Sequence, residues 1–124
     1  MCNCTRLVAN EIDIAIVGAG LTGIMAARTL TDKGYEVLLI DKGKSVGGRM
    51  ATRRIGGGKV DHGAQFFTVR TERFQSEVDQ WLSQGFIKPW FGENHPRFMS
   101  PGGMNALAKT LTQYLSIELK TEIN

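Results

Sequence analysis

Cysteine is scarce in this 124-residue chain, which contains only Cys2 and Cys4. Both lie in a polar N-terminal stretch, and neither has a further cysteine or a histidine nearby. Zinc takes four protein ligands in structural sites, and three plus a water in catalytic ones, so this pair does not predict a metal site. We expect residues 1–10 to form a flexible tail that carries two reduced thiols.

Long apolar stretches are also absent. No run in the sequence approaches the roughly 18 apolar residues that a membrane-spanning helix requires. The N-terminus has no apolar core of the kind found in secretory signals. We therefore expect a cytoplasmic protein that has no membrane partner.

Charge of either sign is modest, with a formal net charge of +3 and an isoelectric point near 9.1. The basic cluster of Arg49, Arg53, Arg54 and Lys59 has no interleaved aromatic residues, so nucleic acid is not an expected partner. An apolar share of 42% and 15 glycines are typical of a globular α/β domain. We expect residues 11–124 to form one such domain, or a portion of a larger protein.

The most informative stretch is a glycine-rich turn between a strand and a helix. An apolar, β-branched run over residues 12–17 stops at Gly18, and a helical pattern follows over residues 21–33. Gly18, Gly20 and Gly23 have the G-x-G-x-x-G spacing of dinucleotide-binding turns. In that motif the first glycine permits the tight turn, the second lets the backbone approach a pyrophosphate, and the third allows close packing of helix on sheet. The predicted ligand is a dinucleotide, bound at the N-terminus of the helix.

A second strand is predicted over residues 37–40 (VLLI), a continuous apolar run of the kind buried on both faces of a parallel sheet. Gly34 is expected to end the helix before it. Together these elements predict a right-handed βαβ unit. Asp41 follows the second strand, about 20 residues after the glycines, where an acid accepts hydrogen bonds from the adenosine ribose. Because an acid repels a 2′-phosphate, NADP is disfavoured.

The remaining pattern alternates between turns and short elements. Thr71 is expected to cap a helix in which Phe74 and Trp81 are core residues, and Ser100-Pro101 is expected to begin a later helix, with proline at its first position. The other predicted elements are a hairpin with its tip at residues 56–58, the capped helix over residues 72–84, strands over residues 86–91 and 97–99, and a strand over residues 116–119.

Three further blocks carry a resemblance to a known family. Residues 46–50 (VGGRM) resemble the second glycine motif of the flavin-dependent amine oxidase superfamily. Residues 61–67 (DHGAQFF) and 98–107 (FMSPGGMNAL) resemble blocks of its renalase-like branch. With the first glycine turn, the four blocks follow one another in the right order over nearly the whole chain. The chain is identified as the N-terminal part of a renalase-like, FAD-dependent oxidoreductase. This resemblance implies an α/β, Rossmann-like FAD-binding domain whose parallel sheet is incomplete.

The resemblance also implies roles for individual residues. The implied cofactor-binding residues are Gly18, Gly20, Thr22, Gly23, Asp41, Gly48, Arg49, Gln65 and Phe66. The first four would line the FAD pyrophosphate, and Asp41 would hold the adenosine ribose. Arg49 would approach the phosphates or the ribityl chain, and Gln65 and Phe66 would lie beside the isoalloxazine ring. Arg49 as a surface cation and Phe66 as a core side chain are the alternatives.

The implied reaction transfers a hydride from an amine or a dihydropyridine-like small molecule to flavin N5, with reoxidation by O₂. No catalytic residue is assigned, and His62 is given no role. Two other readings stay open: an NAD-binding module without flavin, and a non-catalytic interaction domain. Members of the family are more than twice as long, so we expect a fragment that self-associates or needs a complementing C-terminal chain. Whether this chain alone turns over substrate stays open.

Overall fold

The computed structural model describes residues 11–124. The expected tail, with Cys2 and Cys4, lies outside the described residues. The chain divides into two compact units. Of the described residues, unit 1 comprises residues 11–48 and those from Leu111 onward, and unit 2 runs from Arg49 to Thr110. The prediction of one domain over residues 11–124 stays a prediction.

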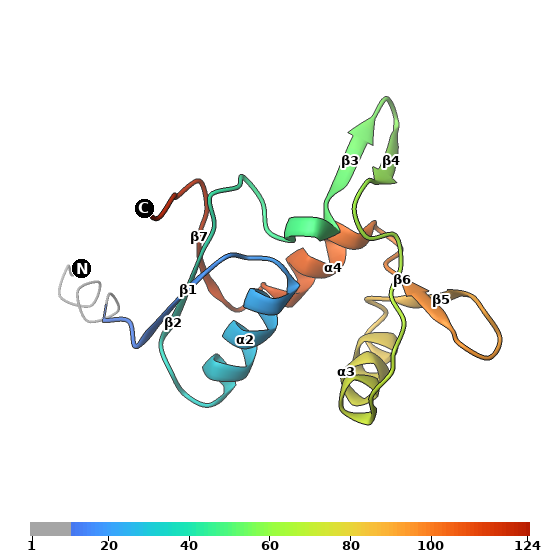
Figure 1. The fold of residues 1–124 in the computed structure, drawn as a ribbon, viewed down its shortest axis with the longest axis horizontal. Helices are drawn as coiled ribbons and strands as arrows, with labels where there is room; N and C mark the ends of the chain where they lie inside the picture. Colours follow the sequence, from blue (N-terminus) through green and yellow to red (C-terminus); the bar gives the residue numbers. More distant parts are fainter. Residues whose placement is uncertain (1–10) are drawn as a thin grey trace. The chain divides into compact units, whose positions relative to one another are not determined.

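Unit 1 is built on a parallel sheet (Figure 1). Its elements are β1 (Ile14–Val17), α2 (Leu21–Asp32), β2 (Val37–Ile40) and β7 (Ser116–Glu118). The strand order is β1-β2-β7, and both neighbouring pairs are parallel. The α2 helix connects β1 to β2, which are parallel neighbours in the sheet. The expected α/β class, with a βαβ unit in a parallel sheet, is confirmed.

Burial along the strands follows their positions in the sheet. The central strand β2 is the continuous apolar run, and its Leu39 is fully buried. In β1, Ile14 and Ile16 are half-buried, whereas Val17 is 65% exposed. Among the described residues β1 ends the sheet. Ile24 and Ala27, the buried residues of α2, supply the helix side of this core.

The α2 helix ends as the glycine predicts. Gly34 has a φ of +93° and donates its N–H to the carbonyl of Thr31 at 2.9 Å. The N–H of Tyr35 donates to the carbonyl of Leu30 at 3.2 Å. This pair of bonds is the Schellman motif, which satisfies carbonyls at the end of a helix. Lys33, predicted as the last helical residue, is instead the cap that follows it.

Unit 2 contains two antiparallel hairpins and the helices near them (Figure 1). The elements after β2 and before β7 are the short helix η1 (Gly48–Met50), β3 (Thr52–Ile55), β4 (Gly58–Asp61), α3 (Glu72–Ser83), β5 (Lys88–Phe91), β6 (Arg97–Met99) and α4 (Met104–Leu111). The first hairpin turns at residues 56–57, within the predicted tip. Among residues 11–124, no helix combines the length and the apolar character that crossing a bilayer requires.

An aromatic cluster forms the core of unit 2. Thr71 caps α3 as predicted, because its hydroxyl accepts the N–H of Phe74 at 3.2 Å. Trp81, on the same helix, is 2% exposed. The ring centroid of Phe67 lies 5.7 Å from the centroids of Phe74 and Phe98, and 6.2 Å from that of Trp81. The prediction that Phe74 and Trp81 are packing residues is confirmed.

The last helix begins later than the sequence predicts. Ser100 and Pro101 do not begin α4; they belong to a turn in which the N–H of Gly103 donates to the carbonyl of Ser100 at 3.0 Å. Helical residues begin at Met104. Gly103 has a φ of +95°, a left-handed conformation that glycine adopts without strain. The expectation that proline occupies the first helical position is therefore wrong.

Side chains distant in the sequence set the start of α4. The Asp61 carboxylate, at the end of β4, accepts the N–H of Met104 at 3.0 Å and the hydroxyl of Thr52 at 2.5 Å. The Thr52 hydroxyl in turn accepts the N–H of Asn105 at 3.1 Å. A carboxylate at a helix N-terminus also interacts favourably with the helix dipole. This cap satisfies two of the unpaired N–H groups of the first turn and fixes the helix at Met104.

Replacing Gly103 with alanine should destabilise unit 2. A Cβ at Gly103 would lie 2.9 Å from both Thr52 side-chain atoms Cγ2 and Oγ1, and the φ of +95° would be strained. We expect Gly103→Ala to lower the free energy of unfolding by about 1–3 kcal/mol, measured by urea denaturation. Gly57→Ala is the matched control, because a Cβ at Gly57 meets open space, and it should change stability by less than about 0.5 kcal/mol. Equal losses in the two variants would contradict the cap geometry.

Candidate functional site

The candidate site in unit 1 begins where β1 meets α2. Gly18 follows the last residue of β1 with a φ of +110°, and its N–H donates to the carbonyl of Ile40 at 2.7 Å. Ala19 is fully buried beneath the turn. Gly20 is the N-cap of α2, with an extended backbone (φ −75°, ψ 178°). The chain therefore makes a sharp turn that is fastened to the end of the neighbouring strand.

The outer side of this turn is open. A Cβ built on Gly20 meets no atom within 4 Å. The N-cap residue Gly20 has no side chain with which to cap α2, and the first turn of the helix contains no acidic residue. The first N–H groups of a helix have no partner within the helix, and the helix dipole makes this end positive. The exposed Thr22 lies in the same turn. The arrangement presents main-chain donors to an anion that can approach Gly20 closely.

Gly23 has the packing role that the motif predicts. A Cβ at this position would overlap with the carbonyl oxygen of Gly18 and lie 3.5 Å from Cγ2 of Ile16. The α2 backbone can therefore approach the end of β1 this closely only if residue 23 has no side chain. The third glycine of the motif is thus required by the fold itself.

Asp41 holds the turn in place. One oxygen of its half-buried carboxylate accepts the N–H of Ala19 at 2.7 Å, and the other accepts the N–H of Gly43 at 2.7 Å. Its own N–H donates to the carbonyl of Glu118, at the end of β7. Sequence reasoning gave Asp41 a ligand role and missed this structural one. Because a carboxylate has about four acceptor positions, two remain for a ligand.

The second glycine motif lies directly against the first. The N–H of Gly47 donates to the carbonyl of Ala19 at 2.7 Å. Gly48 has a φ of +51°, and a Cβ on it would lie 3.3 Å from Cα of Gly20. Two segments nearly 30 residues apart in the sequence thus meet backbone to backbone within unit 1. The structure brings together Gly18, Gly20, Gly23, Asp41 and Gly48.

Three of the other predicted site residues, Arg49, Gln65 and Phe66, belong to unit 2. The side chain of Arg49 is exposed, and its carbonyl accepts the N–H of Ala64 at 2.8 Å. A Cβ on Gly63 would overlap with this same carbonyl. The chain around Gly63 can therefore pack against the backbone of Arg49 only because residue 63 has no side chain. Gln65 and His62 are exposed. The cofactor roles expected for Arg49 and Gln65 stay predictions.

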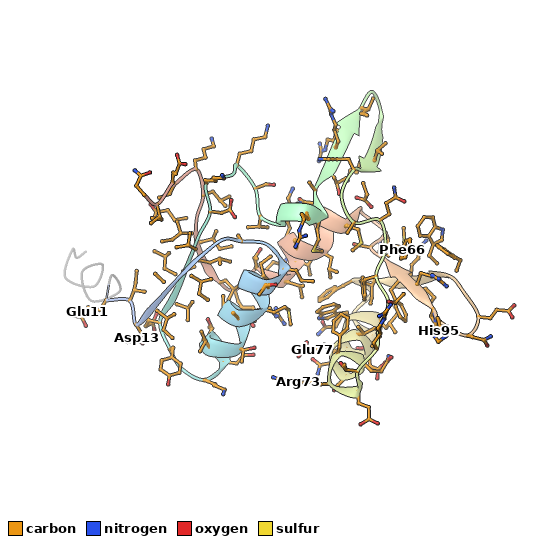
Figure 2. The ribbon with its side chains drawn as sticks, viewed as in Figure 1. Glu11, Asp13, Phe66, Arg73, Glu77 and His95 are labelled. Atoms are coloured by element: carbon orange, nitrogen blue, oxygen red, sulfur yellow. The ribbon has the colours of Figure 1, made fainter. Side chains whose placement is uncertain are left out.

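Phe66 is 39% exposed and lies outside the core (Figure 2). Its neighbour Phe67 instead packs within the aromatic cluster of unit 2. The Phe66 ring packs edge to face against two exposed rings of β5. Its centroid lies 6.2 Å from that of Trp90 and 5.4 Å from that of Phe91. These three residues form a surface aromatic patch that the sequence did not predict. The alternative in which Phe66 is a core side chain is not what the structure shows.

Comparison with known families agrees with this geometry. The model of the NAD(P)-binding Rossmann-like domain family matches residues 16–81, more than half of the chain. The chain belongs to this family. The matched residues contain both glycine motifs and Asp41. Among residues 11–124, no group of three or more His, Cys, Asp or Glu side chains is arranged to hold a metal ion.

The chain is also similar to individual oxidases. The chain is 45% identical over 65 residues to a protein of Mycobacterium tuberculosis named as a flavin-containing monoamine oxidase, a match that covers 50% of this chain and 14% of that protein. It is 30% identical over 95 residues to putrescine oxidase of Kocuria rosea, covering 77% of this chain and 20% of that one. The chain thus spans a fifth or less of the length of these relatives.

A solved structure shows the same fold. Putrescine oxidase bound to putrescine superimposes with a TM-score of 0.51 and 33% sequence identity. The superposition covers 64% of this chain and 17% of the oxidase. The expected Rossmann-like fold and the similarity to flavin-containing amine oxidases are confirmed.

Replacing Gly23 with alanine should destabilise unit 1. The added methyl group overlaps with the main-chain carbonyl of Gly18, which cannot move without opening the turn. We expect Gly23→Ala to lower the free energy of unfolding by up to about 3 kcal/mol, measured by urea denaturation. Gly20→Ala is the control, because the added methyl group would lie in open space. It should lower the free energy of unfolding by no more than about 1 kcal/mol, the cost of a changed N-cap residue. A larger loss at Gly20 than at Gly23 would refute this packing.

Asp41→Asn should loosen the turn. The amide has one acceptor oxygen in place of two, so the N–H of either Ala19 or Gly43 loses its partner. We expect a loss of about 1–3 kcal/mol in unfolding free energy, measured by urea denaturation. Asp13→Asn is the matched control: its exposed carboxylate accepts a single main-chain N–H, from Glu36 at 2.9 Å, so the variant keeps a sufficient acceptor. If the two variants lost equal stability, the structural role assigned to the two hydrogen bonds of Asp41 would be wrong.

Proposed function

We propose that this chain is the FAD-binding part of a flavin-dependent oxidoreductase of the amine oxidase type, in its renalase-like branch. The observation that carries the proposal is the open turn at Gly20, with the uncapped N-terminus of α2 behind it and Gly48 directly beside it. The similarity to flavin-containing oxidases favours a flavin dinucleotide over other ligands of such turns.

The residues around the turn fit a pyrophosphate. Such a group needs N–H donors, close backbone approach and the absence of negative charge. Gly18, Gly20 and Gly23 provide the turn and the approach, and Thr22 adds a hydroxyl. No acidic residue lies in the first turn of α2 to repel the phosphates. Main-chain dipoles would thus supply most of the binding.

Asp41 would hold the adenosine ribose through the acceptor positions that Ala19 and Gly43 leave free. A hydroxyl that donates to a carboxylate forms a charge-assisted bond, roughly twice as strong as a neutral one. The same negative charge would repel a 2′-phosphate, which disfavours NADP as the ligand. One side chain would therefore both fasten the turn and select the nucleotide.

Three further residues are proposed to bind the cofactor. Arg49 has an exposed guanidinium, which can form paired hydrogen bonds with phosphate or ribityl oxygens. Gln65 offers an exposed amide, and Phe66 offers an exposed ring. The exposure of these three side chains supports a ligand role, because none of them is part of the aromatic core.

A bound flavin supplies a hydride acceptor at N5 and is reoxidised by O₂, which suits an amine or a dihydropyridine-like substrate. The residues of this chain would bind and orient the cofactor, and we assign none of them to the chemical step. Because the chain spans a fifth or less of its named relatives, the proposal for these 124 residues concerns cofactor binding.

An NAD-binding module is the second candidate function. It is favoured by the family description, which names NAD(P), and by the fact that the glycine turn and Asp41 suit the ADP half of either cofactor. The two candidates differ only at the far end of the ligand, so direct binding measurements separate them.

Gly20→Val should abolish cofactor binding without unfolding the chain. The extended backbone of Gly20 suits any residue, and the space around its Cβ is free of protein atoms, so the valine would occupy the place of the pyrophosphate. By equilibrium dialysis, we expect the purified chain to bind FAD more tightly than NAD, and the variant to lose at least about 100-fold in FAD affinity.

Gly57→Val, at the open tip of the β3–β4 hairpin, is the matched control and should leave FAD affinity unchanged. A colourless chain that binds NAD in preference to FAD would reverse the order of the two functions. Unchanged FAD affinity in folded Gly20→Val would exclude the turn as the binding site.

A further inference from the structure

Unit 2 contains a groove that has no part in the proposed cofactor site. Its volume is about 440 Å³, within the range of about 300–1,000 Å³ that small-molecule sites occupy. It is lined by residues 68–70, by Gln75 on α3, and by residues 94–98 from the β5–β6 loop and β6. In Figure 2, His95 marks the loop side of this groove.

The lining of the groove is rich in hydrogen-bond donors. Arg70, His95 and Arg97 contribute to it, together with Thr68 and Asn94, and no aspartate or glutamate is among its lining residues. Unit 2 as a whole is basic, because residues 49–110 contain nine lysines and arginines against five acids. The local charge therefore favours an anion and disfavours a cation.

Arg97 is held in place by contacts within the β5–β6 hairpin. Its Nη1 donates to the carbonyl of His95 at 3.1 Å, and its Cζ lies 5.2 Å from the ring centroid of Phe91. Its Nε is buried without a hydrogen-bond partner among the described residues. Buried donors are nearly always paired, so this one is unusual. A guanidinium fixed in this way loses little side-chain freedom when it binds an oxyanion.

We propose that this groove binds the oxyanion group, carboxylate or phosphate, of a small organic molecule. Arg97 and Arg70 provide the charge, and the polar residues around them provide further donors. An apolar ligand would leave these donors unpaired, and a metal ion would face two guanidinium groups and no acid. The site lies wholly within unit 2 and does not rest on the proposed cofactor function.

Titration of the full chain with inorganic phosphate, and separately with acetate, tests the proposal by ¹H–¹⁵N correlation spectra at constant ionic strength. We expect saturable shifts at the amides of residues 68–70 and 94–98 with at least one of the two anions. Saturation with phosphate alone identifies a phosphate ester as the ligand class, and with acetate alone a carboxylate. Shifts at residues 18–23 report the glycine turn and are fitted separately.

Arg97→Gln and Arg70→Gln should each weaken binding in the groove at least about tenfold. Arg70 is exposed, so its variant keeps the test valid if the loss of Arg97 disturbs the hairpin. Arg73→Gln is the matched control, because it also removes one positive charge from unit 2. In Figure 2, Arg73 lies on the other side of α3 from His95. The variant should therefore leave affinity within about twofold.

Two results would overturn the proposal. One is the absence of saturable shifts at the groove with either anion at tens of millimolar. The other is an equal loss of affinity in Arg73→Gln and Arg70→Gln, because general attraction to a basic surface does not depend on which charge is removed.

Discussion

The close approach of main-chain segments at the end of β1 is the constraint on which unit 1 depends. The carbonyl of Gly18 occupies the place of a side chain at residue 23, and Cα of Gly20 leaves barely enough space for one at residue 48. The β1–α2 turn, the first turn of α2 and the segment at Gly48 thus pack backbone against backbone. Such packing leaves the N–H groups at the start of α2 exposed and held in one geometry. A rigid set of donors binds an anion without first having to be ordered.

Carboxylates at strand ends organise both units in the same way. In unit 1, Asp41 follows β2 and accepts N–H groups from the glycine turn and from Gly43. In unit 2, Asp61 ends β4 and accepts the first N–H of α4. In each case an acid fixed by a strand pairs main-chain donors that would otherwise lack partners. Because the turn depends on Asp41 even without a ligand, structural and binding roles in this residue can be separated only by measuring both.

Local signals in the sequence were sufficient for much of the fold. The continuous apolar run of β2, the glycine that ends α2 and the threonine that caps α3 act on neighbouring residues, so their patterns predict them. The start of α4 could not be found in this way, because its cap comes from Asp61, some 40 residues earlier. For the same reason the sequence indicated an acid at position 41 but not its bond to Ala19, and it did not tell which of Phe66 and Phe67 faces the core.

The two anion sites that we propose, one in each unit, differ in the groups that would bind the anion. The turn in unit 1 offers main-chain N–H groups and a helix dipole, equivalent to about half a charge, with no cationic side chain in its helical turn. Its selectivity must therefore come from shape, since only a ligand thin enough to lie against Gly20 reaches the donors. The groove in unit 2 instead offers two full charges on long side chains, one of them stacked on Phe91. Such a site accepts anions of varied shape and owes its strength to charge, so it suits a ligand that is smaller and more exchangeable than a dinucleotide.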